Sequence, residues 1–168
     1  FDVIVVGGGH AGMEAAYISA RMGARTALVS LSLETIGLMP CNPSVGGLGK
    51  GHIVYEVSAL GGLMPQLCST TYLQARMLNT RKGPAVQGLR LQIDKYAYKK
   101  RAQQVLQATP NLTIVEGTVE RLVLESLNGN VRVMGAFVAP RDGTERIEYR
   151  AQSVVVTAGT FLNGMLHT

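Results

Sequence analysis

The sequence contains no tryptophan, only three phenylalanines and only two cysteines among 168 residues. The lack of large aromatic side chains argues against a stacking surface for single-stranded nucleic acid. Two cysteines, Cys41 and Cys68, are too few for a disulfide framework, and because they form no CxxC pair we expect no metal site. A reducing, cytoplasmic location is the natural interpretation of such sparse cysteine usage.

Long apolar runs and extremes of charge are also absent. No run approaches the roughly 20 apolar residues of a membrane helix, so we expect no membrane association. A glycine cluster follows the apolar residues 1–6, where a signal peptide would need a cleavage site. With 46% apolar and 16% charged residues the chain is not of the disordered class. Because residues 164–168 end without a stop signal, we expect a fragment of a longer protein.

Positive charge is concentrated in one segment of the chain. Eight Lys or Arg residues and one acid, Asp94, lie between Arg76 and Arg101, although the whole chain carries a formal net charge of only +5. Such a cluster forms either a solvated helix face or a surface for polyanions such as RNA. Charge alone does not decide between the two interpretations.

The first 30 residues have the pattern of a βαβ unit. Residues 2–6 form a short, mostly apolar run that is rich in β-branched residues, as in a buried parallel strand. Residues 13–22 have helical apolar spacing and end at Gly23, and residues 26–30 form a second strand. A right-handed crossover of about 30 residues accounts for this order.

The glycine motif Gly7-x-Gly9-x-x-Gly12 lies between the first strand and the helix. In dinucleotide-binding proteins the first glycine permits a tight turn, the second lets a pyrophosphate approach the backbone, and the third allows close packing. The helix N-terminus offers N–H groups to the phosphates. We therefore predict cofactor contacts here, with a purely structural turn as the alternative. The predicted residues are Gly7, Gly9, His10, Ala11 and Gly12.

The acidic residue that usually binds the ribose hydroxyls is missing from the end of the second strand. Ser30 occupies that place, and we include it among the cofactor-binding candidates. Glu34 follows four residues later and is an alternative ribose ligand, although an ordinary surface glutamate explains it equally well.

A second glycine-rich stretch covers residues 42–51 and precedes a helical pattern from His52 to Leu60. It is not a P-loop, because Gly51 follows Lys50 where that motif needs Ser or Thr. Closely spaced glycines before a helix suit a phosphate or a flat ligand, with a flexible loop as the alternative. The candidate residues are Asn42, Pro43, Gly46, Gly47 and Lys50.

Cys41 lies directly before this stretch, with Lys50 and His52 nearby in sequence. Neighbouring cations lower a thiol pKa and create a reactive thiolate. A buried cysteine of purely structural function is an equally good interpretation, and it is the one we give to Cys68.

The remaining pattern completes an α/β fold. We expect one domain, residues 1–168, that is part of an FAD-binding domain: Rossmann-like, with a parallel sheet and an inserted antiparallel β-meander. Its predicted parts are a βαβ unit with the glycine-rich loop (1–60), the meander (117–150) and a return strand to the cofactor site (151–168). The element predictions are a loop over 31–51, a helix from Pro84 to about Ala108, strands at 112–116, 118–125, 131–138, 146–149 and 153–157, and a turn at 158–160.

Five segments together resemble one known family. They are Val5–Glu14, Thr35–His52, Ala59–Gly62, Leu78–Val86 and Val154–Leu162. The first alone fits any flavoprotein with two dinucleotide-binding motifs, whereas the second and fourth are far more specific. They resemble the GidA/MnmG family of tRNA uridine 5-carboxymethylaminomethyl modification enzymes, over essentially all 168 residues but only about a quarter of such a protein.

The resemblance implies a flavin-dependent tRNA-modifying enzyme with FAD, NADH and methylenetetrahydrofolate as cofactors. It implies an MnmE-type GTPase partner, a homodimer for the full-length protein, and modification at C5 of the wobble uridine. A fragment of this size is expected to be inactive alone. Cys41 matches the family's cysteine near the isoalloxazine and would act on the uridine as nucleophile or acid/base. Thr157, Ala158, Gly159 and Thr160 would pass close to FAD, and Arg81, Lys82 and Arg90 would contact tRNA phosphates.

Three alternatives stay open at this point. One is a folate- and FAD-dependent tRNA uracil methyltransferase, against which the loop Met39–Pro43 speaks. Another is an NAD(P)- or FAD-dependent oxidoreductase that acts on a small molecule. The last is a non-catalytic nucleotide- or RNA-binding module.

Overall fold

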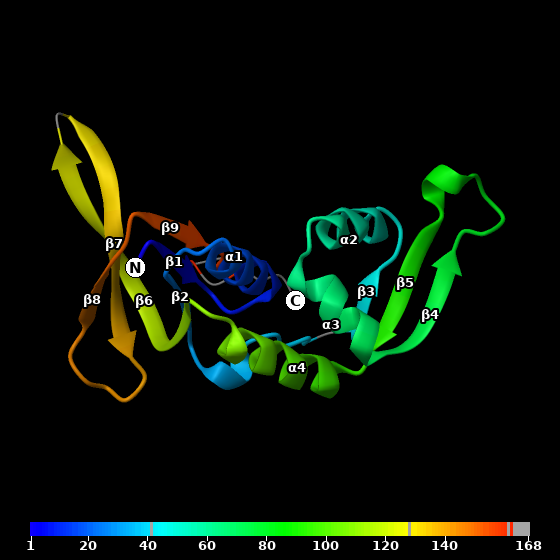
Figure 1. Ribbon diagram of the computed structural model, residues 1–168, viewed down its shortest axis with the longest axis horizontal. Coiled ribbons are helices and arrows are strands. Elements are labelled where there is room, and N and C mark those ends of the chain that lie inside the picture. Colours follow the sequence, from blue (N-terminus) through cyan, green and yellow to red (C-terminus); the bar gives the residue numbers. More distant parts are fainter. Residues whose placement is uncertain (41, 128, 161, 163–168) are drawn as a thin grey trace. The chain divides into compact units, whose positions relative to one another are not determined.

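The computed structural model describes residues 1–40, 42–127, 129–160 and 162. Cys41, the predicted catalytic residue, therefore lies outside the described residues. The described residues form two compact units (Figure 1), one from residues 1–36 and 105–168 and the other from residues 37–104. The predicted part boundaries within the chain remain predictions.

The first unit contains a six-stranded sheet with the order β8-β7-β6-β2-β1-β9. Strands β6, β2, β1 and β9 are parallel, and β6, β7 and β8 form an antiparallel meander. This confirms the predicted α/β fold with a parallel sheet and an inserted meander. The strands are β1 Val3–Val6, β2 Thr26–Ser30, β6 Leu112–Leu127, β7 Asn130–Pro140, β8 Ile147–Arg150 and β9 Ser153–Val156.

The central strands β1 and β2 are apolar because both of their faces are covered. All five residues of β2 are buried. Helix α1, His10–Arg21, contacts β1 and β2 and buries Met13, Ala16, Tyr17 and Ala20. On another side of the strands, residues of the meander join the core. That cluster consists of Ile4, Ala27, Val29, Val138 and Ala151.

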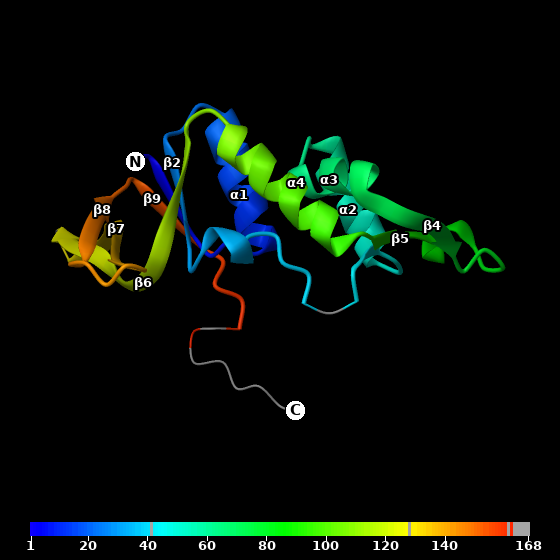
Figure 2. The ribbon, with the colours of Figure 1, turned by 90° about the horizontal axis from the view of Figure 1, so that it is seen from below.

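Strand β6 continues through a position where the sequence predicted a break. Residues 112–116 pair in parallel with β2, and residues 117–127 pair antiparallel with β7. Figure 2 shows one long curved strand. A Cβ at Gly117 would lie 2.6 Å from the carbonyl oxygen of Ala139, so the missing side chain lets β7 approach closely. Gly117 therefore connects the two pairings instead of ending the strand.

The second unit contains a three-stranded antiparallel sheet with the order β3-β5-β4. The boundary between the two units falls within helix α4. The elements are η1 Leu33–Thr35 in the first unit, then β3 Ser44–Gly46, α2 Lys50–Ala59, α3 Leu63–Thr71, β4 Tyr72–Leu78, η2 Pro84–Val86, β5 Gly88–Ile93 and α4 Lys95–Ala108.

The predicted helix from Pro84 to about Ala108 is wrong over residues 84–94. Pro84 begins a short 3₁₀ turn, a strand follows at Gly88–Ile93, and the α-helix begins only at Lys95. Asp94 fixes that start, because its Oδ1 accepts hydrogen bonds from the amides of Tyr96 and Ala97, both at 3.0 Å. An N-cap of this kind satisfies amides that have no partner within the helix.

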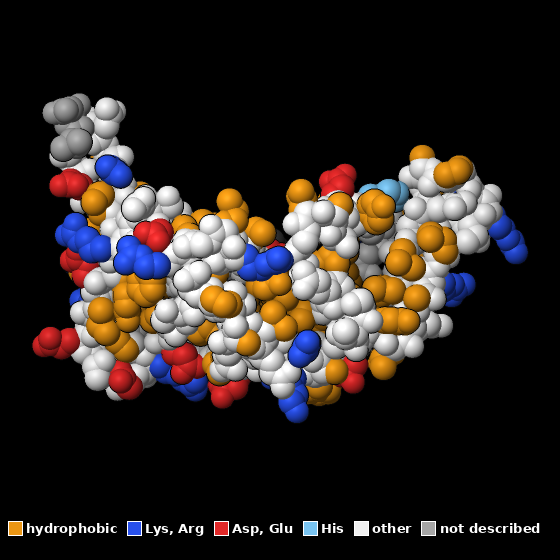
Figure 3. Space-filling model, viewed as in Figure 1, with side chains coloured by type: hydrophobic (Ala, Val, Ile, Leu, Met, Phe, Trp, Pro, Cys, Tyr) orange, Lys and Arg blue, Asp and Glu red, His pale blue; other side chains and the backbone are white. Residues whose placement is uncertain are grey.

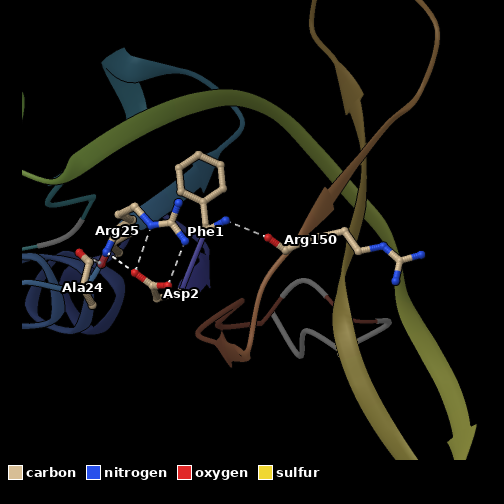
Figure 4. A network of polar contacts seen from close by, with 6 residues as sticks. Phe1, Asp2, Ala24, Arg25 and Arg150 are labelled. Atoms are coloured by element: carbon tan, nitrogen blue, oxygen red, sulfur yellow. Dashed lines mark hydrogen bonds and ion pairs between the residues drawn. The ribbon is translucent and has the colours of Figure 1, made fainter.

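A polar network joins the amino ends of β1 and β2 (Figure 4). The Arg25 backbone amide donates to Asp2 Oδ2 at 2.8 Å, and its guanidinium reaches Asp2 Oδ1 at 3.1 Å. The side-chain hydrogen bond from Arg25, with the backbone bond second, lowers the pKa of Asp2. The network fixes the register at the amino edge, opposite the glycine turn.

Within the described residues, no helix has the length and apolar character needed to cross a bilayer.

Candidate functional site

The carboxyl ends of the parallel strands define the candidate site of the first unit. Because the strands are parallel, the glycine turn after β1, Ser30 on β2, Glu116 on β6 and Thr157 after β9 all lie at this edge. Ligands of open α/β sheets bind outside this edge, where helix N-termini also point.

The first and third glycines of the motif are required by the fold. Gly7 has φ +107°, and a Cβ there would lie 2.7 Å from the carbonyl oxygen of Thr157. A Cβ at Gly12 would lie 1.8 Å from the carbonyl oxygen of Gly7 and 2.7 Å from Thr157 Oγ1. Side chains at either position collide with the neighbouring backbone.

The second glycine is not required by the fold. Gly9 is the N-cap of α1, with φ −71° and ψ −177°, a conformation open to any residue. A Cβ there would meet nothing within 4 Å. The first hydrogen bond of the helix runs from the Met13 amide to the Gly9 carbonyl at 2.9 Å. The amides before Met13 are therefore not part of the helix's own hydrogen-bond series. Gly9 thus leaves an open approach to a helix N-terminus.

His10 is the first residue of α1 and is half-buried. Burial lowers its pKa, an effect that the charge of Glu14 partly opposes. A neutral imidazole suits this position, because a positive charge at a helix N-terminus opposes the helix dipole.

We expect His10 to make the stability of the ligand-free protein depend on pH. Its folded pKa lies below the unfolded value of 6.5, so the unfolded state binds more protons between the two values. Stability therefore falls as the pH drops below about 6.5. Thermal unfolding between pH 5 and 8 checks this, with His10→Gln expected to flatten the slope. An equal slope in the variant would contradict it.

The residue that follows β9 is hydrogen-bonded to the glycine turn. Thr157 Oγ1 donates to the carbonyl oxygens of Val6 at 2.8 Å and Gly7 at 3.1 Å. Thr157 is therefore next to the glycine motif, and its hydroxyl holds the motif in place. Ala158, Gly159 and Thr160 follow in this turn, where Gly159 has φ +63°.

The end of β2 is occupied by a hydrogen-bonded serine. Ser30 is buried, and its Oγ lies 3.3 Å from both the Ser32 carbonyl and Thr35 Oγ1. A Cβ on Gly8 would meet both Ser30 Oγ, at 2.6 Å, and Ile36 Cγ1, at 2.7 Å. Both ends of the loop between Ser30 and Ile36 therefore pack against Gly8, which leaves no space for a side chain there.

Two glutamates lie at the same edge, Glu34 within this loop and Glu116 on β6. Glu34 is exposed and accepts a hydrogen bond from Ser32 Oγ at 2.9 Å, with Arg141 at 3.6 Å. The Ser32 bond, followed by the charge of Arg141, lowers its pKa. Glu116 accepts a hydrogen bond from the Leu33 amide. Glu116 was not predicted as a site residue, although its place at the end of a parallel strand was a signal for this edge.

A pocket of about 400 Å³ lies at the opposite, amino edge of the sheet. Its lining includes Arg25, Asn111 and Thr113. Because open α/β sheets bind ligands at the carboxyl edge, we place the candidate site at the glycine turn and not in this pocket.

The second glycine-rich stretch belongs to the second unit, where it forms the end of β3 and the turn into α2. Gly46 has φ +89°, and a Cβ there would lie 2.3 Å from the Leu89 carbonyl oxygen. Gly47 has φ +101° and donates its amide to the same carbonyl at 2.8 Å. Packing against β5 accounts for these glycines without a ligand. Asn42 and Lys50 are exposed and Pro43 is half-buried.

The three predicted RNA-binding residues are exposed on the β4–β5 hairpin. Arg81 and Lys82 lie in its connecting loop, and Arg90 lies on β5. Figure 3 shows Lys and Arg side chains at the outer edge of this hairpin. Arg90 also lies next to β3 in the sheet, a contact that was not predicted from the sequence.

In the described part of the chain, no three or more His, Cys, Asp or Glu side chains are grouped as a metal site would require.

A parallel sheet with a glycine turn leading into a helix N-terminus defines an α/β protein of the Rossmann dinucleotide-binding class. The family model described as "Glucose inhibited division protein A" matches residues 2–168. The chain belongs to this GidA family.

Individual relatives agree with this assignment. The chain is 49% identical to the tRNA uridine 5-carboxymethylaminomethyl modification enzyme MnmG of Wolinella succinogenes over 99% of its own length and 25% of that protein. It superposes on Aquifex aeolicus GidA with a TM-score of 0.87 and 47% identity, covering 97% of this chain and 26% of that one. The halogenase CndH, described as a variant of FAD-dependent halogenases, shares the fold alone, with a TM-score of 0.62 and 16% identity over 98% of this chain and 38% of its own. The chain spans about a quarter of the length of the curated relatives.

Proposed function

We propose that the first unit binds FAD, with the pyrophosphate at the N-terminus of α1. The observation that carries this proposal is Gly9, since neither its backbone conformation nor its surroundings call for glycine. An open N-cap is what a diphosphate approaching the helix amides requires. Membership of the GidA family and the fold shared with flavoenzymes support the same choice of dinucleotide.

The chain's own residues have distinct tasks in this proposal. Gly9, His10, Ala11 and Gly12 present the turn and the first helical amides to the phosphates. A neutral His10 leaves the helix dipole unopposed by its own charge. Thr157 holds the glycine turn through its two hydrogen bonds, and Ala158, Gly159 and Thr160 continue past the cofactor.

We further propose that the full-length protein modifies tRNA at C5 of the wobble uridine. The relatives' name, tRNA uridine 5-carboxymethylaminomethyl modification enzyme, supports the substrate and the reaction class. Bound FAD would supply the redox chemistry, with methylenetetrahydrofolate as one-carbon donor and NADH as reductant. An MnmE-type GTPase, a homodimer and a cytoplasmic location complete the proposal, in which Ser30 lies near the ribose.

A reconstituted reaction tests this function. Purified protein, the GTPase, unmodified tRNA, methylenetetrahydrofolate, NADH and the amine donor are combined, and the nucleosides are analysed by mass spectrometry. We expect a mass increase on the wobble uridine that requires both FAD and the GTPase. Unchanged uridine despite bound FAD would contradict the proposed reaction. Cys41→Ser is expected to abolish product while FAD stays bound, and full activity of that variant would remove Cys41 from the mechanism.

The hairpin loop is expected to contribute phosphate contacts to tRNA. Arg81→Ala combined with Lys82→Ala removes two exposed cations from the loop. Each lost phosphate contact reduces the slope of log K against log salt by about 0.7 to 0.9, so we expect a reduction of roughly 1.4 to 1.8. Fluorescence anisotropy with labelled tRNA between low and moderate salt measures this slope. An unchanged slope would leave these residues as solvated surface only.

A further inference from the structure

The positive charge of the chain belongs to the second unit. Residues 37–104 contain nine Lys or Arg and two Asp or Glu, a formal charge of +7. The rest of the chain contains seven Lys or Arg and nine Asp or Glu, a formal charge of −2. The excess of cations thus has its origin in one unit, and within it the sheet β3-β5-β4 offers an ordered surface.

The two faces of this sheet differ in chemistry. Strand pairing aligns Gly46, Arg90 and Arg76 in one row across the sheet. Two residues along, the aligned row is Ser44, Gln92 and Gln74, which lies on the same face because side chains alternate along a strand. The opposite face carries apolar rows such as Val45, Leu91 and Ala75. The face with Arg76 and Arg90 also carries Leu78 at its far end, and its charged members are both arginines.

Arg76 and Arg90 lie directly opposite each other on antiparallel strands. Directly opposed residues have Cβ atoms about 4.5–5.5 Å apart, and like charges in such a pair destabilise a sheet. Within the described residues, neither guanidinium makes an ion pair with a carboxylate. Arg90 is instead oriented by a hydrogen bond from its Nη2 to Ser44 Oγ at 3.1 Å. The pair is exposed and lacks a counter-charge in the described chain.

We propose that Arg76 and Arg90 together hold one phosphate of the RNA substrate on their face of this sheet. Two planar guanidinium groups at cross-strand distance can both donate to the oxygens of one phosphodiester. The bound phosphate then removes the repulsion that the pair suffers alone. Arg76 thereby becomes a binding residue, and Ser44 a positioning residue that acts through Arg90. This inference rests on the proposed tRNA substrate.

A double-mutant cycle on the purified full-length protein tests the shared phosphate. The Kd of an unmodified tRNA transcript is measured at fixed salt for Arg76→Gln, Arg90→Gln and the double variant. Two groups that hold one phosphate are coupled, so we expect each single variant to weaken binding about tenfold and the double variant to be little weaker than either. Losses that multiply in the double variant, or no loss in the singles, would overturn the proposal.

A matched control separates a site from the general field of the unit. Lys100→Gln with Arg101→Gln removes the same charge from exposed positions of α4. We expect this pair to weaken binding less, and with independent contributions. If the control variants lost tRNA affinity equally and with the same coupling, the effect of the arginine pair would be explained by the general positive charge of the unit, and the proposal would be wrong. In the absence of RNA, Arg76→Gln is expected to retain or raise the melting temperature, because it relieves repulsion, and a lowered one would indicate a structural role instead.

The FAD content of the variants shows whether the arginine pair binds a phosphate of tRNA or of the cofactor. Together with the tRNA affinity of the wild type, it also separates failure of the arginine site from failure of the proposed tRNA substrate. Normal bound FAD with weakened tRNA binding in the arginine variants supports the proposal. Lost FAD with unchanged tRNA affinity would assign the pair to the cofactor and overturn it. A wild-type protein that binds FAD but no tRNA contradicts the proposed substrate and the arginine site together, whereas a wild type that binds tRNA with a multiplicative cycle contradicts only the arginine site.

Discussion

Gly12→Ala is expected to destabilise the first unit by about 3 kcal/mol, at the upper end of the usual cost of overpacking. The added methyl group would lie 1.8 Å from the Gly7 carbonyl oxygen, which belongs to the backbone of the glycine turn. Alanine is preferred over glycine within a helix by about 1 kcal/mol, but a collision with fixed backbone exceeds this gain. Thermal and urea unfolding of the ligand-free protein measure the difference.

The control for this prediction is a residue of the same helix turn that has space. Gly9→Ala adds the same methyl group where nothing lies within 4 Å. Its stability loss should stay within about 1 kcal/mol, the usual cost of an unfavourable N-cap. If Gly12→Ala were as stable as Gly9→Ala, the close packing of α1 against the glycine turn would be wrong.

Gly9→Ser is expected to weaken FAD binding on the order of a hundredfold, about 2.7 kcal/mol, while the ligand-free protein keeps or gains stability. Serine is a better N-cap than glycine by a few tenths of a kcal/mol, and the position has a backbone conformation open to any residue. The same side chain fills the approach of the diphosphate to the helix amides. Titration with FAD and unfolding of the ligand-free variant give the two quantities separately.

The opposite signs of these two effects make the outcome diagnostic. A fold-determining glycine loses stability and binding together, as Gly12 should. Gly9 should lose binding alone. Unchanged FAD affinity in Gly9→Ser would contradict a ligand at this helix N-terminus, and a large loss of stability would show that the fold itself needs the glycine.

The parallel part of the fold was predictable because its signals are local. Short, mostly apolar runs at residues 2–6 and 26–30, with a glycine turn and a helical pattern between them, indicate one structure only. The strand at 88–93 was missed because its local signals fit two structures. Its apolar residues alternate with Arg90 and Gln92, yet they also fit a loose helical spacing after Pro84. Alternation together with the N-cap Asp94 was the stronger signal.

In the candidate site too, the features set by contiguous sequence were predictable and those set by strand pairing were not. The glycine motif is a contiguous sequence pattern, so its turn and its helix were predictable. The partners at the carboxyl edge, Glu116 and the returning Ile36, depend on which strands pair, and sequence periodicity carries no such information. The Arg76–Arg90 pair likewise exists only through the register of β4 and β5. Because the predicted helix from Pro84 included Arg90, that residue could not be expected to face Arg76 across a sheet.

The visible absorption spectrum of the purified protein tests the central claim most directly. The protein is incubated with FAD and passed through gel filtration, and the spectrum of the protein peak is recorded. We predict a flavin band that travels with the wild-type protein and is lost in Gly9→Ser. A wild-type peak without flavin absorbance, after saturating FAD, would contradict the assignment of the glycine turn as a dinucleotide site.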